Sequence, residues 1–108
     1  MEITFATEEL KEVCLAPAPK ADSLPREVVS ALHALYNAMR NADHVGELPL
    51  GRPGQEELSS DLTWRINLVN GYGVIMRIDQ NKLPRDGSSI NWTGIYRVKV
   101  MVIEAPDA

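Results

Sequence analysis

The chain is poor in the residues from which disulfides and metal sites are built. Among its 108 residues are one cysteine and two histidines. A single cysteine excludes an intrachain disulfide and fits a reducing compartment, so we expect the protein in the cytoplasm. Neither His33 nor His44 stands at ligand spacing from Cys14, and we therefore predict no metal and no cofactor. We interpret Cys14 as a small buried apolar residue.

Long apolar runs are also absent. None approaches the roughly 20 residues that span a bilayer, and no basic stretch leads into an apolar one, so we expect neither a membrane span nor a secretion signal. The length predicts one domain over residues 1–108. The net charge of −4 argues against general nucleic-acid binding. The charge is uneven, however: residues 1–61 carry a net −6, whereas residues 62–108 carry a net +2.

The clearest structural signal is the segment 62–78. Two alternating runs rich in β-branched and aromatic residues flank Asn70-Gly71, and this pair tolerates the positive φ of a tight hairpin turn. A third alternating run near the C-terminus has the apolar row Tyr96, Val98, Val100 and Val102. If the three strands pair, one face of the sheet is apolar. The other face then gathers four cations with no acid among them, namely Arg65, Arg77, Arg97 and Lys99.

The first half of the chain predicts one strand and two helices. Residues 2–6 alternate as a short strand, and Thr7 is placed to cap a short helix that ends before Pro17. Pro25 suits the first turn of a long helix, whose apolar stripe would cover the sheet. Residues 43–61 and 81–93 are predicted long connections. The expected fold is α+β: a short N-terminal strand, two helices, then a three-stranded antiparallel run, with the helices on one face.

The cationic face is the main candidate site, because the chain contains neither a glycine-rich phosphate loop nor an evident nucleophile–base pair. Arginine binds phosphate through two parallel hydrogen bonds and stays charged at any working pH. Such groups can stabilise the pentavalent phosphate formed when a 2′-hydroxyl attacks RNA. That reaction also needs a proton donor and an acceptor. The sequence leaves several choices open for these roles: Tyr72, Tyr96, His44 and Glu104. The same cations could equally be ordinary solvated positions on an open sheet.

The chain resembles the RelE/ParE superfamily of bacterial toxins, and most closely its HigB branch, the plasmid-maintenance killer proteins. The resemblance rests on the order of elements, the Gly-Arg-Pro-Gly segment 51–54, the hairpin motifs 64–68 and 70–72, and Met76-Arg77-Ile78. It implies a RelE-like fold and a toxin of a type II toxin–antitoxin system that cleaves ribosome-associated mRNA. It also implies a cognate antitoxin, of helix-turn-helix type, as a partner. Arg77 would contact the scissile phosphate.

The chain departs from the HigB pattern at three places. Arg52 stands where a histidine usually precedes the loop proline, Gly73 stands where an arginine usually begins the second hairpin strand, and Glu104-Ala105-Pro106 replaces the usual Asp-Tyr-His. On the toxin hypothesis the catalytic residues are Arg77, Arg52 and Tyr96, and the RNA-binding residues are Arg65, Arg97 and Lys99. An alternative is a weakly active or inactive relative that only binds an antitoxin-like protein or RNA. A third interpretation is a small interaction domain unrelated to toxins.

Overall fold

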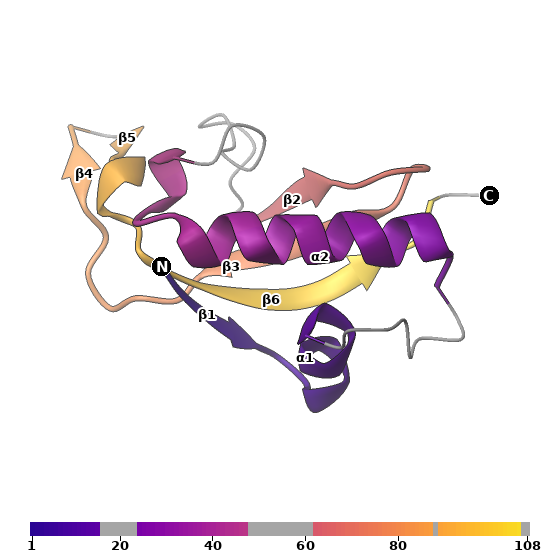
Figure 1. The fold of residues 1–108 in the computed structure, drawn as a ribbon. Coiled ribbons are helices and arrows are strands. Elements are labelled where there is room, and N and C mark those ends of the chain that lie inside the picture. The colour runs from indigo at the N-terminus through magenta and orange to yellow at the C-terminus, as the bar shows by residue number, and fades with distance from the viewer. Residues whose placement is uncertain (16–23, 48–61, 88, 107–108) are drawn as a thin grey trace.

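The computed structural model describes residues 1–15, 24–47, 62–87 and 89–106 (Figure 1). Within them the chain forms a small α+β domain of two α-helices, a four-stranded mixed sheet and a two-stranded ribbon. In chain order the elements are β1 (Glu2–Phe5), α1 (Glu8–Leu15), α2 (Arg26–Asn41), the 3₁₀ turn η1 (Val45–Glu47), β2 (Thr63–Asn67), β3 (Gly73–Ile78), β4 (Arg85–Asp86), β5 (Ser89–Ile90), the 3₁₀ turn η3 (Trp92–Gly94) and β6 (Arg97–Glu104). The predicted α+β class is confirmed. The Gly-Arg-Pro-Gly segment lies outside the described residues.

The sheet has the strand order β1-β6-β3-β2. Strand β3 is antiparallel to both β2 and β6, as the hairpin and the C-terminal run predicted. Strand β1 was predicted as a short strand, but its partner was not predicted; it pairs in parallel with β6 at the edge of the sheet. The hairpin turn is also as predicted: Asn70 and Gly71 both have positive φ, at 58° and 80°, as a type I′ turn requires.

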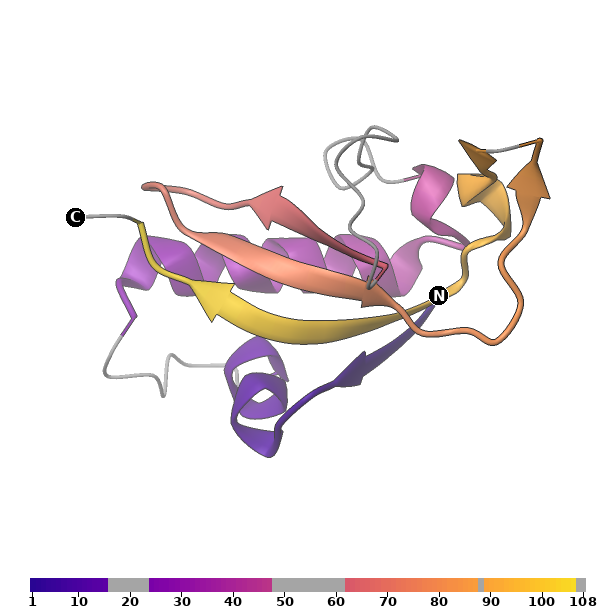
Figure 2. The ribbon, with the colours of Figure 1, turned by 180° about the vertical axis from the view of Figure 1, so that it is seen from behind.

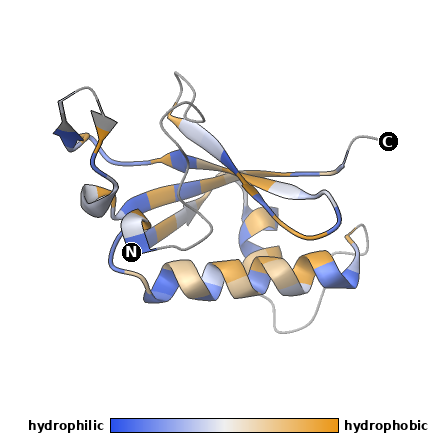
Figure 3. Ribbon diagram, turned by 90° about the horizontal axis from the view of Figure 1, so that it is seen from above, coloured by the Kyte–Doolittle hydropathy of each residue, from blue (hydrophilic) through white to orange (hydrophobic). Residues whose placement is uncertain are grey.

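Helix α2 lies along one face of the sheet, and α1 lies beside its β1 edge (Figures 1 and 2). Pro25 precedes the first turn of α2, and the stripe of this helix that faces inward is buried (Figure 3). The hydroxyl of Thr7 accepts a hydrogen bond from the Leu10 N–H at 3.1 Å, which confirms the predicted cap of α1. His33 on α2 ties the two helices together, since its Nε2 lies 2.8 Å from the Val13 carbonyl oxygen.

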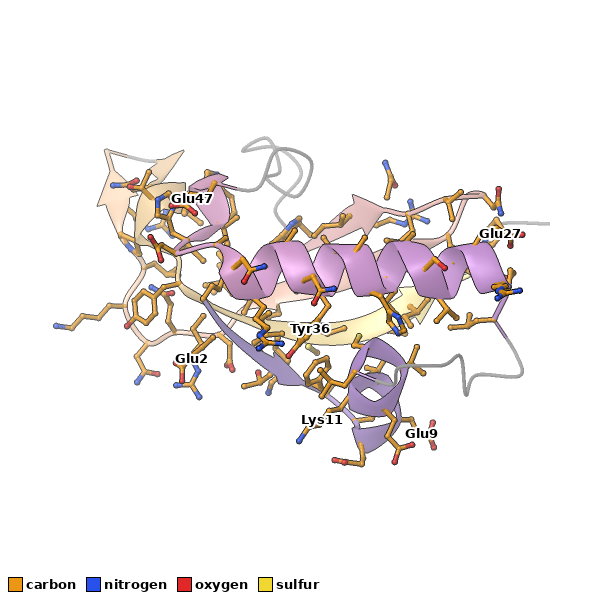
Figure 4. The ribbon with its side chains drawn as sticks, viewed as in Figure 1. Glu2, Glu9, Lys11, Glu27, Tyr36 and Glu47 are labelled. Carbon is orange, nitrogen blue, oxygen red and sulfur yellow. The ribbon has the colours of Figure 1, made fainter. Side chains whose placement is uncertain are left out.

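The core lies between α2 and the sheet. It joins side chains from α2, η1 and the covered face of the sheet, among them Met39, Val45, Trp64, Ile66, Val74, Met76, Ile78, Val98 and Val100. Trp64 packs edge-on against Trp92, with ring centroids 5.7 Å apart. Tyr36 of α2 reaches toward the β1 edge, where its ring lies 6.0 Å from that of Phe5 (Figure 4). The connection predicted over residues 81–93 contains the β4–β5 ribbon, which the sequence did not reveal.

The predicted apolar row of β6 is wrong at both of its ends. Val98 and Val100 are each 1% exposed, but Val102 is 47% exposed and Tyr96 is 54% exposed. A β-bulge explains Val102: Met76 pairs with Val100 while Ile75 pairs with Val102, so the alternation of β6 shifts by one residue between them. Tyr96 lies before the first residue of β6, where the strand alternation does not yet apply.

Candidate functional site on the open sheet face

The sheet face that α2 leaves uncovered, here called the open face, is in front in Figure 2. The strand register determines which side chains share it, because residues paired across neighbouring strands point to the same side. The outward-facing residues of β2, β3 and β6, together with the β1 residues paired with them, form the open face. They are Glu2, Thr4, Thr63, Arg65, Asn67, Gly73, Ile75, Arg77, Arg97, Lys99, Val102 and Glu104. The four predicted cations therefore do share one face.

The prediction that no acid lies among these cations is wrong at Arg65. Its Nε donates to Glu104 Oε1 at 2.9 Å, its Nη1 donates to Asn67 Oδ1, and its Nη2 donates to the Gly71 carbonyl oxygen at 3.0 Å. The guanidinium lies over Gly73, where any Cβ would collide with it. Arg65 therefore braces the hairpin against the end of β6, with much of its charge already neutralised.

Arg97 also has acidic neighbours. Its Nε lies 3.9 Å from a Glu2 carboxylate oxygen and 3.8 Å from Asp79 Oδ2. The same Asp79 oxygen accepts a hydrogen bond of 3.2 Å from the Thr4 hydroxyl. Glu2 and Thr4 reach this place only because β1 pairs with β6, and that pairing was not predicted. These exposed pairs are worth little in stability, but they reduce the local positive charge.

The remaining two cations face each other at the centre of the sheet. Arg77 on β3 is directly paired with Lys99 on β6, and we call these two residues the central cation pair. In the part of the chain that the structure describes, neither side chain makes a hydrogen bond or an ion pair. Like charges directly opposite on neighbouring strands destabilise a sheet. This arrangement suits a bound anion, because the arginine fork and the lysine charge can hold one phosphate together.

Of the other residues predicted for catalysis or proton transfer, those that the structure describes do not join the central cation pair. Tyr96 lies three residues before Lys99, about 10 Å along an extended chain. Arg52 lies outside the described residues. His44 is in the segment before η1, where its Nε2 is 3.5 Å from Glu47 Oε1 and its buried Nδ1 has no hydrogen-bond partner among the described residues. Glu104, a possible proton acceptor, is the partner of Arg65.

Cys14 behaves as the buried apolar residue that we expected. It is 4% exposed, and burial raises the pKa of its thiol to about 11, so the sulfur stays protonated near neutral pH. Among the described residues no group of three or more His, Cys, Asp or Glu side chains could hold a metal ion. The helices in the same part of the chain are too short or too polar to cross a membrane.

Comparison with known proteins does not extend this picture. No protein-family model matches the chain, and neither a curated protein nor a solved structure matches it. A function therefore has to be inferred from the open face itself.

Proposed function

We propose that this protein is a RelE/HigB-like toxin of a type II toxin–antitoxin system and that it cleaves ribosome-associated mRNA. The observation that carries the proposal is the central cation pair, two like charges left without partners among the described residues, on the face opposite α2. The resemblance of the hairpin motifs supports a RelE-like fold, in which helices cover one face and RNA binds the other. A cognate antitoxin of helix-turn-helix type is the proposed protein partner.

In the proposed reaction the 2′-hydroxyl of a nucleotide loses its proton and attacks the adjacent phosphorus. The bond from phosphorus to the 5′-oxygen of the next nucleotide breaks, and that oxygen takes up a proton, which leaves a 2′,3′-cyclic phosphate and a 5′-hydroxyl. Arg77 donates two hydrogen bonds to that phosphate, and Lys99 adds a second charge, so both stabilise the negative charge that develops in the transition state. Arg97, at the start of β6, is proposed to bind the RNA on the side toward β1, and Tyr96, which precedes it, is proposed as a catalytic residue. Arg52 is proposed as a further catalytic cation.

The surroundings of Arg65 on the open face bear on two departures from the HigB pattern, at Gly73 and at Glu104. Position 73 usually carries an arginine, and here the guanidinium of Arg65 lies over Gly73 instead. Arg65 thereby places a cation where the family has one, although Glu104 partly neutralises it. Its proposed role in RNA binding is therefore smaller than that of Arg77 or Lys99.

The test is mRNA cleavage by the purified chain on programmed ribosomes, mapped by primer extension. Arg77→Ala should reduce cleavage by about 10²- to 10³-fold, the usual loss when a donor to a developing charge is removed. The matched control is Arg40→Ala, because Arg40 is an exposed arginine in the last turn of α2. Unchanged cleavage by Arg77→Ala would contradict the proposed role of this residue. No cleavage by the folded native chain would refute the ribonuclease.

The second candidate function is binding without cleavage. It is favoured by the three acids on or beside the open face, which pair with Arg65 and Arg97, and by the scattered positions of Tyr96, His44 and Glu104. Co-sedimentation with mRNA-programmed ribosomes separates the two candidates. Sedimentation with the ribosomes in the absence of cuts, lost in Arg77→Ala, would support the binding-only relative.

A further inference from the structure

A pair of apolar side chains, one partly buried and one exposed, lies next to the central cation pair on the open face. Ile75 and Val102 are directly paired on β3 and β6, and Val102 is 47% exposed. Val102 reaches this face only because of the bulge, which reverses the alternation of β6 after Val100. The pairing of β1 with β6 ends at Phe5 and Val100, so no β1 residue stands beside Val102. We call Ile75 and Val102 the apolar shelf.

The apolar shelf has polar groups on both sides along the strands. On one side lies the central cation pair, two residues away on β3, which is about 6.6 Å at the rise of a strand. On the other side is a surface hollow lined by Arg65, Gly71, Glu104, Ala105 and Pro106. Arg65 has five N–H groups, and three of them are engaged by Glu104, Asn67 and Gly71. Its other two N–H donors make no hydrogen bond to the described residues, and Arg65 itself lines this hollow.

We propose that the apolar shelf is the seat for the base of the RNA nucleotide whose phosphate binds the central cation pair. The inference rests on the proposed function and adds where the base is held. A nucleotide carries the anionic phosphate at one end, and beyond it the base with its flat apolar face and its polar edge. The open face presents cations, an apolar surface and donors in the same order. An aliphatic side chain lying against a base face gains apolar burial without reading the sequence, while the free donors of Arg65 can meet acceptors on the base edge.

The test compares two trinucleotides with 2′-O-methyl groups, which block cleavage, one complete and one with the central base removed. Their dissociation constants are measured from the shifts of methyl NMR signals in the labelled protein. The complete trinucleotide should bind about fivefold more tightly, the gain expected from burying about 40 Å² of apolar surface. Removing the base should also abolish the shifts of the Ile75 and Val102 methyl groups.

Three variants locate the base. Val102→Ser should reduce the fivefold preference to less than twofold, whereas Val102→Ile should keep it. Leu15→Ser is the matched control: Leu15 is 44% exposed, close to the 47% of Val102, but belongs to α1. Both polar substitutions fall on side chains that are almost half exposed, so the fold should tolerate them. Arg77→Ala should weaken both trinucleotides equally, because each retains its phosphates.

The outcomes separate this inference from the proposed function. If Val102→Ser keeps the fivefold preference while Arg77→Ala weakens both ligands, the base lies elsewhere and the phosphate site stands. If neither trinucleotide binds, the apolar shelf is not a nucleotide seat, and cleavage on ribosomes still decides the proposed function independently. If both trinucleotides bind but Arg77→Ala changes neither dissociation constant, the central cation pair is not the phosphate site, and both proposals are wrong.

Discussion

The two faces of the sheet follow different rules. On the face covered by α2, the side chains of β2 and β3 alternate as expected, and Trp64, Val74 and Met76 are at most 3% exposed. On the open face, the electrostatic environment of each charged side chain depends on the residues that lie near it on the neighbouring strands. Acids neutralise Arg65 and Arg97, whereas Arg77 and Lys99 face each other. Exclusion of water determines which side chains occupy the covered face. On the open face, pairing between strands that are distant in the sequence determines which charged groups become neighbours.

Truncation of the covered face should give the largest effect on stability. Trp64→Ala removes a side chain that is 3% exposed and its edge contact with Trp92, so the free energy of unfolding should fall by about 3–5 kcal/mol. Urea denaturation followed by circular dichroism measures this loss. Arg77→Ala on the neighbouring strand is the control, and it should change the free energy of unfolding by no more than about 0.5 kcal/mol. Equal losses from the two variants would mean that the open face is also part of the core.

A charge reversal on the open face should separate stability from function. Lys99→Glu places an acid opposite Arg77, so a repulsive cross-strand pair becomes an attractive one. The free energy of unfolding should rise by about 0.2–1 kcal/mol, while binding of the trinucleotides and cleavage of mRNA should be lost. The gain should shrink in high salt, because the pair is near the surface. A less stable Lys99→Glu protein would contradict the idea that these two cations repel each other.

A third effect on stability concerns pH and the buried thiol. The pKa of Cys14 is about 11 in the folded chain, against 9.0 for an ordinary thiol, so the folded state holds its proton more tightly than the unfolded state. The Cys14 contribution to the free energy of unfolding should therefore be constant below pH 9 and should decline as the pH rises from 9 toward 11.

Urea denaturation at pH 8 and pH 10 measures this decline, and Cys14→Ala is the control. Because the substitution also leaves a small cavity, the change between the two pH values is compared, not the stability at either one. The native chain should lose more stability between these pH values than Cys14→Ala. Identical changes in the two proteins would show that the thiol does not contribute.

Local signals in the sequence predicted the elements well. The Asn70-Gly71 turn, the Thr7 cap and the Pro25 start of α2 all depend on a few neighbouring residues, and all three are confirmed. The placement of four cations on one face also followed from alternation. The function proposed for that face is still a prediction.

The features that the sequence did not reveal all depend on contacts between distant residues. The parallel pairing of β1 with β6 brings Glu2 beside Arg97, and no local sequence pattern predicts this pairing. The bulge depends on how β6 fits against β3, and it moves Val102 and Glu104 to the open face. The central cation pair could be separated from the neutralised arginines only after these two features were known.

The bulge also has an evolutionary consequence, because the residues before it and the residues after it alternate between the two faces of the sheet in opposite phase. Selection for apolar side chains should act on positions 98 and 100 before the bulge, but on position 103 after it, where Ile103 pairs with the buried Val74. Loss of one residue at Met101 would remove the bulge and leave Val102, Ile103 and Glu104 paired with the same residues, on the same sides of the sheet. In any lineage that shares this chain, a deletion within β6 should therefore be tolerated best at position 101.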